Sequence, residues 1–206
     1  STATKSMFCT PQTQPICRSV FSDASGLPIL SSGTYRIDHT SPLNQRWGGW
    51  YVTGTSGRQK HMGNMICEGR RSAEEEDNKD GLNVTDLSKF FKTSTYLAPH
   101  SDIVALMVLE HQAQMHNLLT RANYLARFAL HEEMELNKAL GRADLGHTES
   151  TLSRVRNAGE PLVKYMLFSD EAKLTEPLKG TSAFADEFAR REPRDKRGRS
   201  LRDFDL

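Results

Sequence analysis

Residues 101–140 read SDIVALMVLEHQAQMHNLLTRANYLARFALHEEMELNKAL, and the spacing of their apolar and small side chains predicts one long amphipathic helix. Ser101 or Asp102 suits the N-cap position, and Gly141 follows Lys138 as a stop signal. Steps of three and four residues connect the positions of the apolar stripe: Val104, Met107, His111, Gln114 or Met115, Leu118, Ala122, Leu125 and Ala129.

The residues after this helix predict a second helix that packs against it. A helical pattern covers 149–169, with an interruption at Gly159 and a restart at Pro161, because proline is tolerated in a first helical turn. A short third helix is expected over 182–191. Two long apolar faces pack as an antiparallel pair, so we expect a mainly α-helical fold built on a long helical hairpin, about 101–140 and 149–169.

The first half of the chain has a different composition. Residues 1–100 are rich in Gly, Pro, Ser and Thr and contain only short candidate strands, such as 33–37 and 50–53. The expected organisation is therefore a loop-rich segment over 1–100, the hairpin with the short helix over 101–192, and a basic linker or tail over 193–206.

Both tryptophans and a His-Met pair lie in one glycine-rich segment, residues 47–64, which read WGGWYVTGTSGRQKHMGN. Glycine allows close backbone approach to a flat surface, tryptophan supplies an apolar wall, and His and Met are common axial ligands of haem iron. One interpretation is a buried prosthetic group near Trp47, Trp50, His61 and Met62. The other is a tight hairpin whose aromatic side chains cap a core, with His61 held only by a hydrogen bond.

Composition excludes several classes. The chain has 206 residues and a formal net charge of +1, so no global field favours nucleic acid as a partner. The longest apolar run, 103–109, is far shorter than the roughly 20 residues of a membrane span. The chain opens at Ser1 without the pattern of a signal peptide and stops on apolar Leu206, so we expect an internal segment of a longer protein.

The cysteines and histidines exclude some sites and leave others open. Cys9 and Cys17 either bridge or stay free, and no Cys-x-x-Cys is present for a zinc ribbon, a thioredoxin site or covalent haem attachment. His111 aligns with the apolar stripe and points into the bundle, where it either forms a hydrogen bond or binds a metal or haem. His116 lies about 140° further around the helix. No motif supports a hydrolase, kinase, metalloprotease or di-iron centre.

Several runs together resemble a family of exported c-type-cytochrome-like proteins of planctomycetes and related environmental bacteria, and the similarity extends over nearly the whole chain. These runs are 38–42 (DHTSP), 46–54, 61–64 (HMGN), 83–87, 96–106, 109–112 (LEHQ) and 115–117. The resemblance implies a haem-attachment motif upstream of Ser1 and a continuation beyond Leu206. It also implies a histidine where this chain has Ser56, and Cys9 and Cys17 depart from the pattern.

The resemblance implies haem c as cofactor, a periplasmic or otherwise exported location, and a redox partner protein or other subunits of a larger complex. The candidate axial ligands are His61, which is favoured, Met62, His100, His111 and His116. Trp47, Trp50 and Tyr51 would form the wall, and Arg46, Arg58 or Lys60 would neutralise a propionate. His61, His111 and His116 are also candidate metal ligands. Two functions follow: haem-associated electron transfer, or a non-enzymatic helical scaffold or interaction domain whose histidines are structural.

Overall fold

The computed structural model describes residues 15–67, 77–142, 146–191, 194 and 196–198. Its α-helices there are α1 (Ile103–Ala139), α2 (Glu149–Met166) and α3 (Phe184–Arg190), and its strands are β1 (Arg18–Val20) and β2 (Thr34–Arg36). Short 3-10 helices cover Leu30–Ser32, Leu43–Gln45, Lys79–Gly81, Leu87–Lys89 and Thr93–Thr95. The expected mainly helical character, with short strands in a loop-rich first half, is confirmed.

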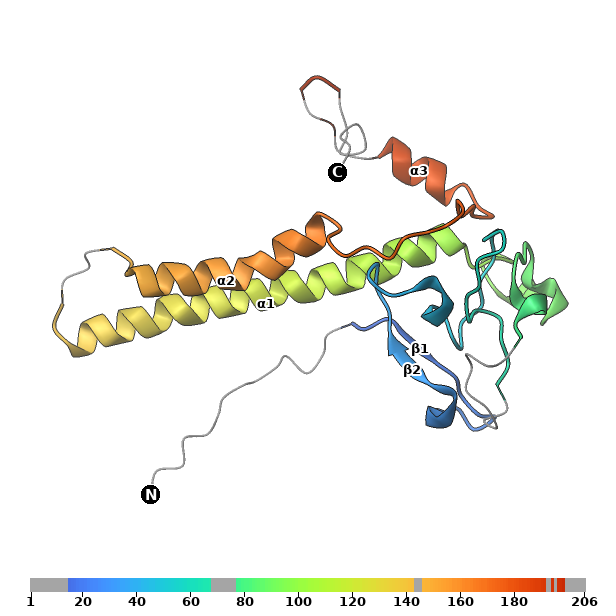
Figure 1. The fold of residues 1–206 in the computed structure, drawn as a ribbon, viewed down its shortest axis with the longest axis horizontal. Helices are drawn as coiled ribbons and strands as arrows, with labels where there is room; N and C mark the ends of the chain where they lie inside the picture. Colours follow the sequence, from blue (N-terminus) through green and yellow to red (C-terminus); the bar gives the residue numbers. More distant parts are fainter. Residues whose placement is uncertain (1–14, 68–76, 143–145, 192–193, 195, 199–206) are drawn as a thin grey trace.

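Helix α1 has 37 residues and is the axis of the molecule (Figure 1). Asp102 caps it, because its carboxylate accepts hydrogen bonds from the backbone N–H groups of Val104 and Ala105. The helix ends at Ala139, and Gly141 follows with a φ of 60°, a left-handed conformation that favours glycine. The predicted cap and the predicted end of the long helix are both confirmed.

Helix α2 lies beside α1 and is continuous from Glu149 to Met166 (Figure 1). Thr148 caps it, and Glu132 of α1 pairs with Arg154 of α2 at 2.5 Å. The predicted interruption at Gly159 is wrong, because Pro161 lies inside the helix. Proline removes one N–H donor there, but the helix continues, and Thr151 before it and Tyr165 after it are both buried.

In the first half, residues 15–67 and 77–102 form a compact head against the start of α1 (Figure 1). Strands β1 and β2 pair antiparallel, with Ser19 opposite Tyr35. Strand β2 confirms the prediction for 33–37, whereas 50–53 is not a strand. The side chain of Asn64 takes the place of a neighbouring strand there: its Oδ1 accepts from Val52 N, and its Nδ2 donates to Val52 O.

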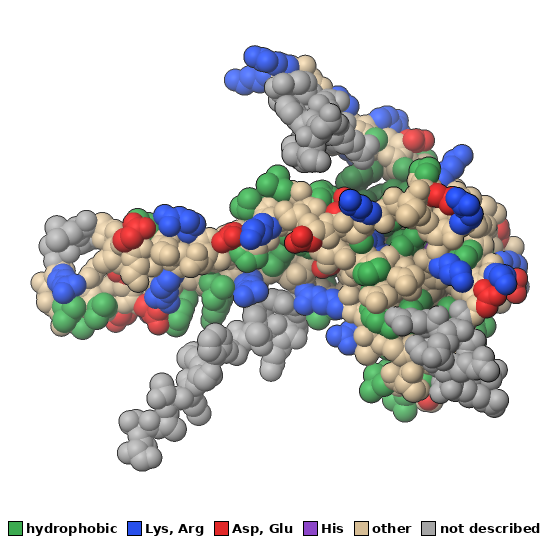
Figure 2. All heavy atoms as spheres, viewed as in Figure 1, with side chains coloured by type: hydrophobic (Ala, Val, Ile, Leu, Met, Phe, Trp, Pro, Cys, Tyr) green, Lys and Arg blue, Asp and Glu red, His purple; other side chains and the backbone are tan. Residues whose placement is uncertain are grey.

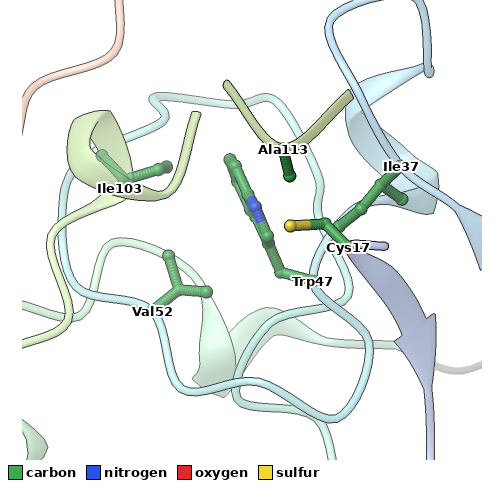
Figure 3. Close-up of a cluster of buried hydrophobic side chains, with 6 residues drawn as sticks. All are labelled: Cys17, Ile37, Trp47, Val52, Ile103 and Ala113. Atoms are coloured by element: carbon green, nitrogen blue, oxygen red, sulfur yellow. The ribbon is translucent and has the colours of Figure 1, made fainter. Parts of the chain in front are cut away.

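The core of the head contains side chains from both halves of the chain. The indole of Trp47, 1% exposed, lies between the loops of the head and the first turns of α1 (Figure 3). The members of this cluster are Cys17, Ile37, Trp47, Val52, Ile103 and Ala113, and a second cluster contains Phe21, Met62 and Cys67. The glycine-rich segment therefore folds against the flank of the long helix.

The segment after α2 returns to the head. Thr55 and Lys179 form an antiparallel bridge, and Asp102 accepts hydrogen bonds from the backbone N–H and hydroxyl of Ser182. Residues 171–183 thus pack on the head, although the organisation expected from sequence grouped them with the hairpin. Of the expected tail, 193–206, only 194 and 196–198 are described.

We call residues 118–142 and 146–166 the arm. Beyond the head, α1 and α2 are the helical neighbours of each other among the residues that the structure describes (Figure 1). Apolar side chains reach the surface of this part of the molecule (Figure 2). In the described part of the chain, no helix combines the length and the apolar character that a bilayer crossing requires.

Candidate functional site

A buried ion pair joins the head to α1. Arg46 Nη1 donates to Glu110 Oε1 at 2.5 Å, and both side chains are at most 2% exposed. The guanidinium of Arg46 also donates to the backbone carbonyls of His39 and Ser41, at 2.7–3.0 Å. One side chain therefore fixes the loop of residues 39–41 and neutralises a carboxylate on the long helix.

Burial dominates the electrostatics of this pair. It raises the pKa of Glu110 to about 7, although Arg46 acts in the opposite direction. The indole N–H of Trp47 also lowers this pKa. Within the described residues, however, Glu110 Oε2 and Trp47 Nε1 form no hydrogen bond of standard geometry. Glu110 therefore changes its protonation state near neutral pH while it is enclosed in protein.

Two histidines meet beside the ion pair. His39 of the head and His111 of α1 place their Nδ1 atoms 2.9 Å apart. The His111 ring stacks on Tyr165 and Phe168, with centroid distances of 4.8 and 4.5 Å. The other ring nitrogen of His39, Nε2, lies 3.4 Å from the carbonyl of Ser169. Burial, and then the charge of His39, lower the pKa of His111.

We call the six residues Arg46, Glu110, His39, His111, Tyr165 and Phe168 the junction cluster. Burial raises the pKa of Tyr165 well above its ordinary value, and its hydroxyl donates to the carbonyl of His111 at 3.4 Å. Three distant parts of the chain converge here: the loop after β2, the second and third turns of α1, and the end of α2 with the residues just after it. The cluster holds head, α1 and α2 together.

His61 and Met62 lie deep in the head, 3% and 2% exposed. The ring of His61 meets Trp47 edge to face at a centroid distance of 5.5 Å, and its Nδ1 accepts from Gly63 N. Burial lowers the pKa of His61 to about 4, so the imidazole is neutral at pH 7. A Cβ on Gly63 would lie 2.3 Å from Val52 Cγ2. This dense packing does not fit a haem ligated by His61 or Met62 against Trp47.

His100 has a different environment, an open aromatic cavity of about 380 Å³ on the head. Tyr51 and Phe91 lie 4.7 Å apart by centroid, and Phe91 and Tyr96 5.3 Å. The indole of Trp50 donates to Arg18 O, which fixes the ring. The cavity lining is Gly49, Trp50, Tyr51, Leu87, Phe91, Tyr96, Ala98, His100 and Ser101. His100 is thus a candidate haem ligand that borders an open aromatic cavity.

The three candidate metal ligands occupy three separate environments. His61 is in the core of the head, His111 is in the junction cluster, and His116 is exposed on α1. Among the described residues, no three or more His, Cys, Asp or Glu side chains form a group that could hold a metal ion. Cys17 carries a free, buried thiol, and Cys9 lies outside the described residues.

Sequence reasoning missed His39, Tyr165 and Phe168 as site residues. The loop that carries His39 has a local signal, because Asp38 Oδ1 accepts from Thr40 N in a turn. Nothing in the sequence spacing indicates that His39 meets His111, 72 residues later. Comparisons with protein-family models, curated proteins and solved structures give no match to this chain.

Proposed function

We propose that this chain is a helical scaffold, in which α1 and α2 form a hairpin arm that associates with the arm of a second copy. The observation that carries this proposal is the exposure of large apolar side chains along the arm. Tyr124 and Phe128, one turn apart on α1, are 53% and 47% exposed. Together they form an exposed apolar pair, and apolar patches larger than such a pair are typical of an interface.

The two helices alone leave this surface uncovered. A helix in a bundle buries an apolar stripe against its neighbours, and within the described part of the chain each arm helix packs along its length on one other helix. Further large apolar side chains are exposed on the arm: Leu119, Leu125, Met134, Leu136, Leu140, Leu152, Val163 and Met166. Two arms packed face to face would supply the neighbours that a four-helix arrangement provides.

Charge on the arm permits such contact. Glu132 pairs with Arg154, and Glu160 with Lys164, so opposite charges on the arm are partly matched within one copy. A second copy can then approach without a large like-charge field. The expected interface is symmetric, with the same residues on both sides.

Sedimentation equilibrium of the wild-type chain tests this proposal. We expect a reversible dimer, and we expect Phe128→Glu to weaken association at least tenfold because a carboxylate would be buried opposite its symmetry mate. Leu30→Glu is the matched control, since Leu30 is an exposed apolar residue on the head (67%). A chain that stays monomeric at every concentration, or a dimer that Phe128→Glu leaves unchanged, contradicts the proposal.

A second candidate function is haem-associated electron transfer in an exported protein. It is supported by the resemblance described above and by one observation, the position of His100 beside the aromatic cavity that contains Trp50 and Tyr51. His100 would hold the iron through a ring nitrogen and the aromatic rings of the cavity would cover the macrocycle; haem would supply one-electron redox chemistry there. Arg46 is committed to Glu110 and is not available for a propionate.

A haem peptide that carries its own covalent attachment and an open axial position is the appropriate probe. Titration with the chain should shift the Soret band as an imidazole binds, and His100→Ala should abolish the shift. His116→Ala, which changes an exposed histidine on α1, should not. An unchanged titration in His100→Ala excludes this site.

A further inference from the structure

We propose that His39 and His111 form a binding site for a divalent transition-metal ion of the Cu²⁺ class, held by their two Nδ1 atoms. This site is independent of the scaffold and haem proposals. The sequence did not indicate His39 as a ligand. In this site His111 binds the metal together with His39, and not with His61 or His116, the other two candidate metal ligands.

The separation of the two nitrogens indicates the coordination geometry. Imidazole nitrogens bind first-row metals at about 2.0 Å, so two of them on adjacent corners of a square lie about 2.8 Å apart, and on a tetrahedron about 3.3 Å. The Nδ1 atoms of His39 and His111 are 2.9 Å apart. Tetragonal geometry with nitrogen and oxygen ligands is typical of Cu²⁺ and Ni²⁺. Axial ligands on opposite faces of one haem iron would instead be about 4 Å apart.

Neighbouring groups hold the imidazole rings of His39 and His111 in place and favour a free lone pair on Nδ1 of His39. His39 Nε2 lies 3.4 Å from the carbonyl of Ser169, an acceptor that favours a proton on Nε2 and leaves a lone pair on Nδ1. The carbonyl of His39 accepts from Arg46 Nη2 and from Ala172 N, which hold the backbone. Stacking on Tyr165 and Phe168 holds the ring of His111.

Charge and exposure are compatible with a cation. The negative charge of Asp38 acts on His111 and favours positive charge there. Arg46, which binds the carbonyl of His39, is paired with Glu110. The chain supplies two nitrogens and, within the described residues, no three-residue ligand group, so water would complete the coordination. His111 is partly exposed to solvent, whereas His39 is 4% exposed, so water would reach the ion from the side of His111.

Two neutral imidazoles that share one proton would give the same separation, so the experiment must distinguish a metal from a hydrogen bond. Cu²⁺ is added to the full chain at pH 7.5, and binding is followed by calorimetry and electron paramagnetic resonance. We expect one saturable site with hyperfine coupling to two imidazole nitrogens. His39→Gln and His111→Gln should each weaken binding at least tenfold, because each removes one of the two ligands.

His116→Gln is the matched control, since it removes an exposed histidine five positions further along α1. It should leave the affinity unchanged. In case either glutamine variant fails to fold, the wild-type chain is also followed by NMR, where bound Cu²⁺ should first broaden the signals of Ser169, Ala172 and the rings of Tyr165 and Phe168. Binding that is equally weakened by His116→Gln, coupling to fewer than two nitrogens, or broadening centred elsewhere overturns the proposal, and a shared proton then explains the pair.

Discussion

Arg46→Met tests the electrostatics of the junction between head and long helix. In the wild-type chain, the pKa of Glu110 is raised from 4.5 to about 7. The folded state therefore binds more protons than the unfolded state between these pH values, and stability falls as pH rises through them. A shift of this size corresponds to about 3 kcal/mol at 1.36 kcal/mol per pKa unit.

Removing Arg46 takes away the group that opposes the effect of burial, so the pKa of Glu110 rises further. The loss of stability then continues above pH 7, at about 1.4 kcal/mol for each additional pKa unit. Breaking a buried pair by removing one partner costs about 3–5 kcal/mol. We therefore expect Arg46→Met to destabilise the chain by about 3–5 kcal/mol at pH 8.5, and by distinctly less at pH 5.5, where Glu110 is protonated.

Urea unfolding at both pH values, followed by tryptophan fluorescence, measures the difference. The double variant Arg46→Met/Glu110→Met should recover part of the loss at pH 8.5, because no buried charge is left without a partner. Arg58→Met is the control, since Arg58 pairs with Glu176 at the surface, where its side chain is 94% exposed. An equal cost of Arg46→Met at the two pH values would refute the reasoning.

Three further substitutions test packing, capping and helix propensity. Gly63→Ala should destabilise the head by about 1–3 kcal/mol in urea unfolding, because the new Cβ would lie 2.3 Å from Val52 Cγ2. Glu133→Gln should speed amide exchange at the start of α2, since the carboxylate accepts from Thr148 N at 2.6 Å. That hydrogen bond lowers the pKa of Glu133 to about 2, so in the wild type the same protection should be complete above pH 4.5 and lost as pH falls towards 2. Gly159→Ala should raise the unfolding free energy by about 0.5–1 kcal/mol, because nothing lies within 4 Å of the added methyl group; a loss of stability would show that α2 needs glycine there.

The helices were predictable because their signals are local. Apolar spacing located α1 to within two residues at its start, and Asp102 is the cap that its side-chain chemistry favours. Helix α3 lies within the expected 182–191 for the same reason. Pro161 misled the prediction for α2, since packing on α1 outweighs the loss of one hydrogen bond.

The head and the junction cluster were not predictable because their contacts join distant residues. Arg46 and Glu110 are 64 residues apart, and a charged residue in either context is ordinarily a surface group. The expected strand over 50–53 failed because a single amide, Asn64, satisfies the backbone of Val52. His61 is buried in the core and His100 borders an open cavity. The local sequence around each histidine does not distinguish these two environments.

Two contacts of the head affect how the chain folds during synthesis. They are the bridge between Thr55 and Lys179 and the hydrogen bonds from Ser182 to Asp102. A ribosome releases Asp102 long before Ser182, which follows 80 residues later. Until α1 and α2 have both been synthesised, the nascent head has no partner for these groups. During translation, the head therefore completes these contacts only after both long helices have been made. A chain released earlier would leave the backbone of Thr55 and the carboxylate of Asp102 without these partners.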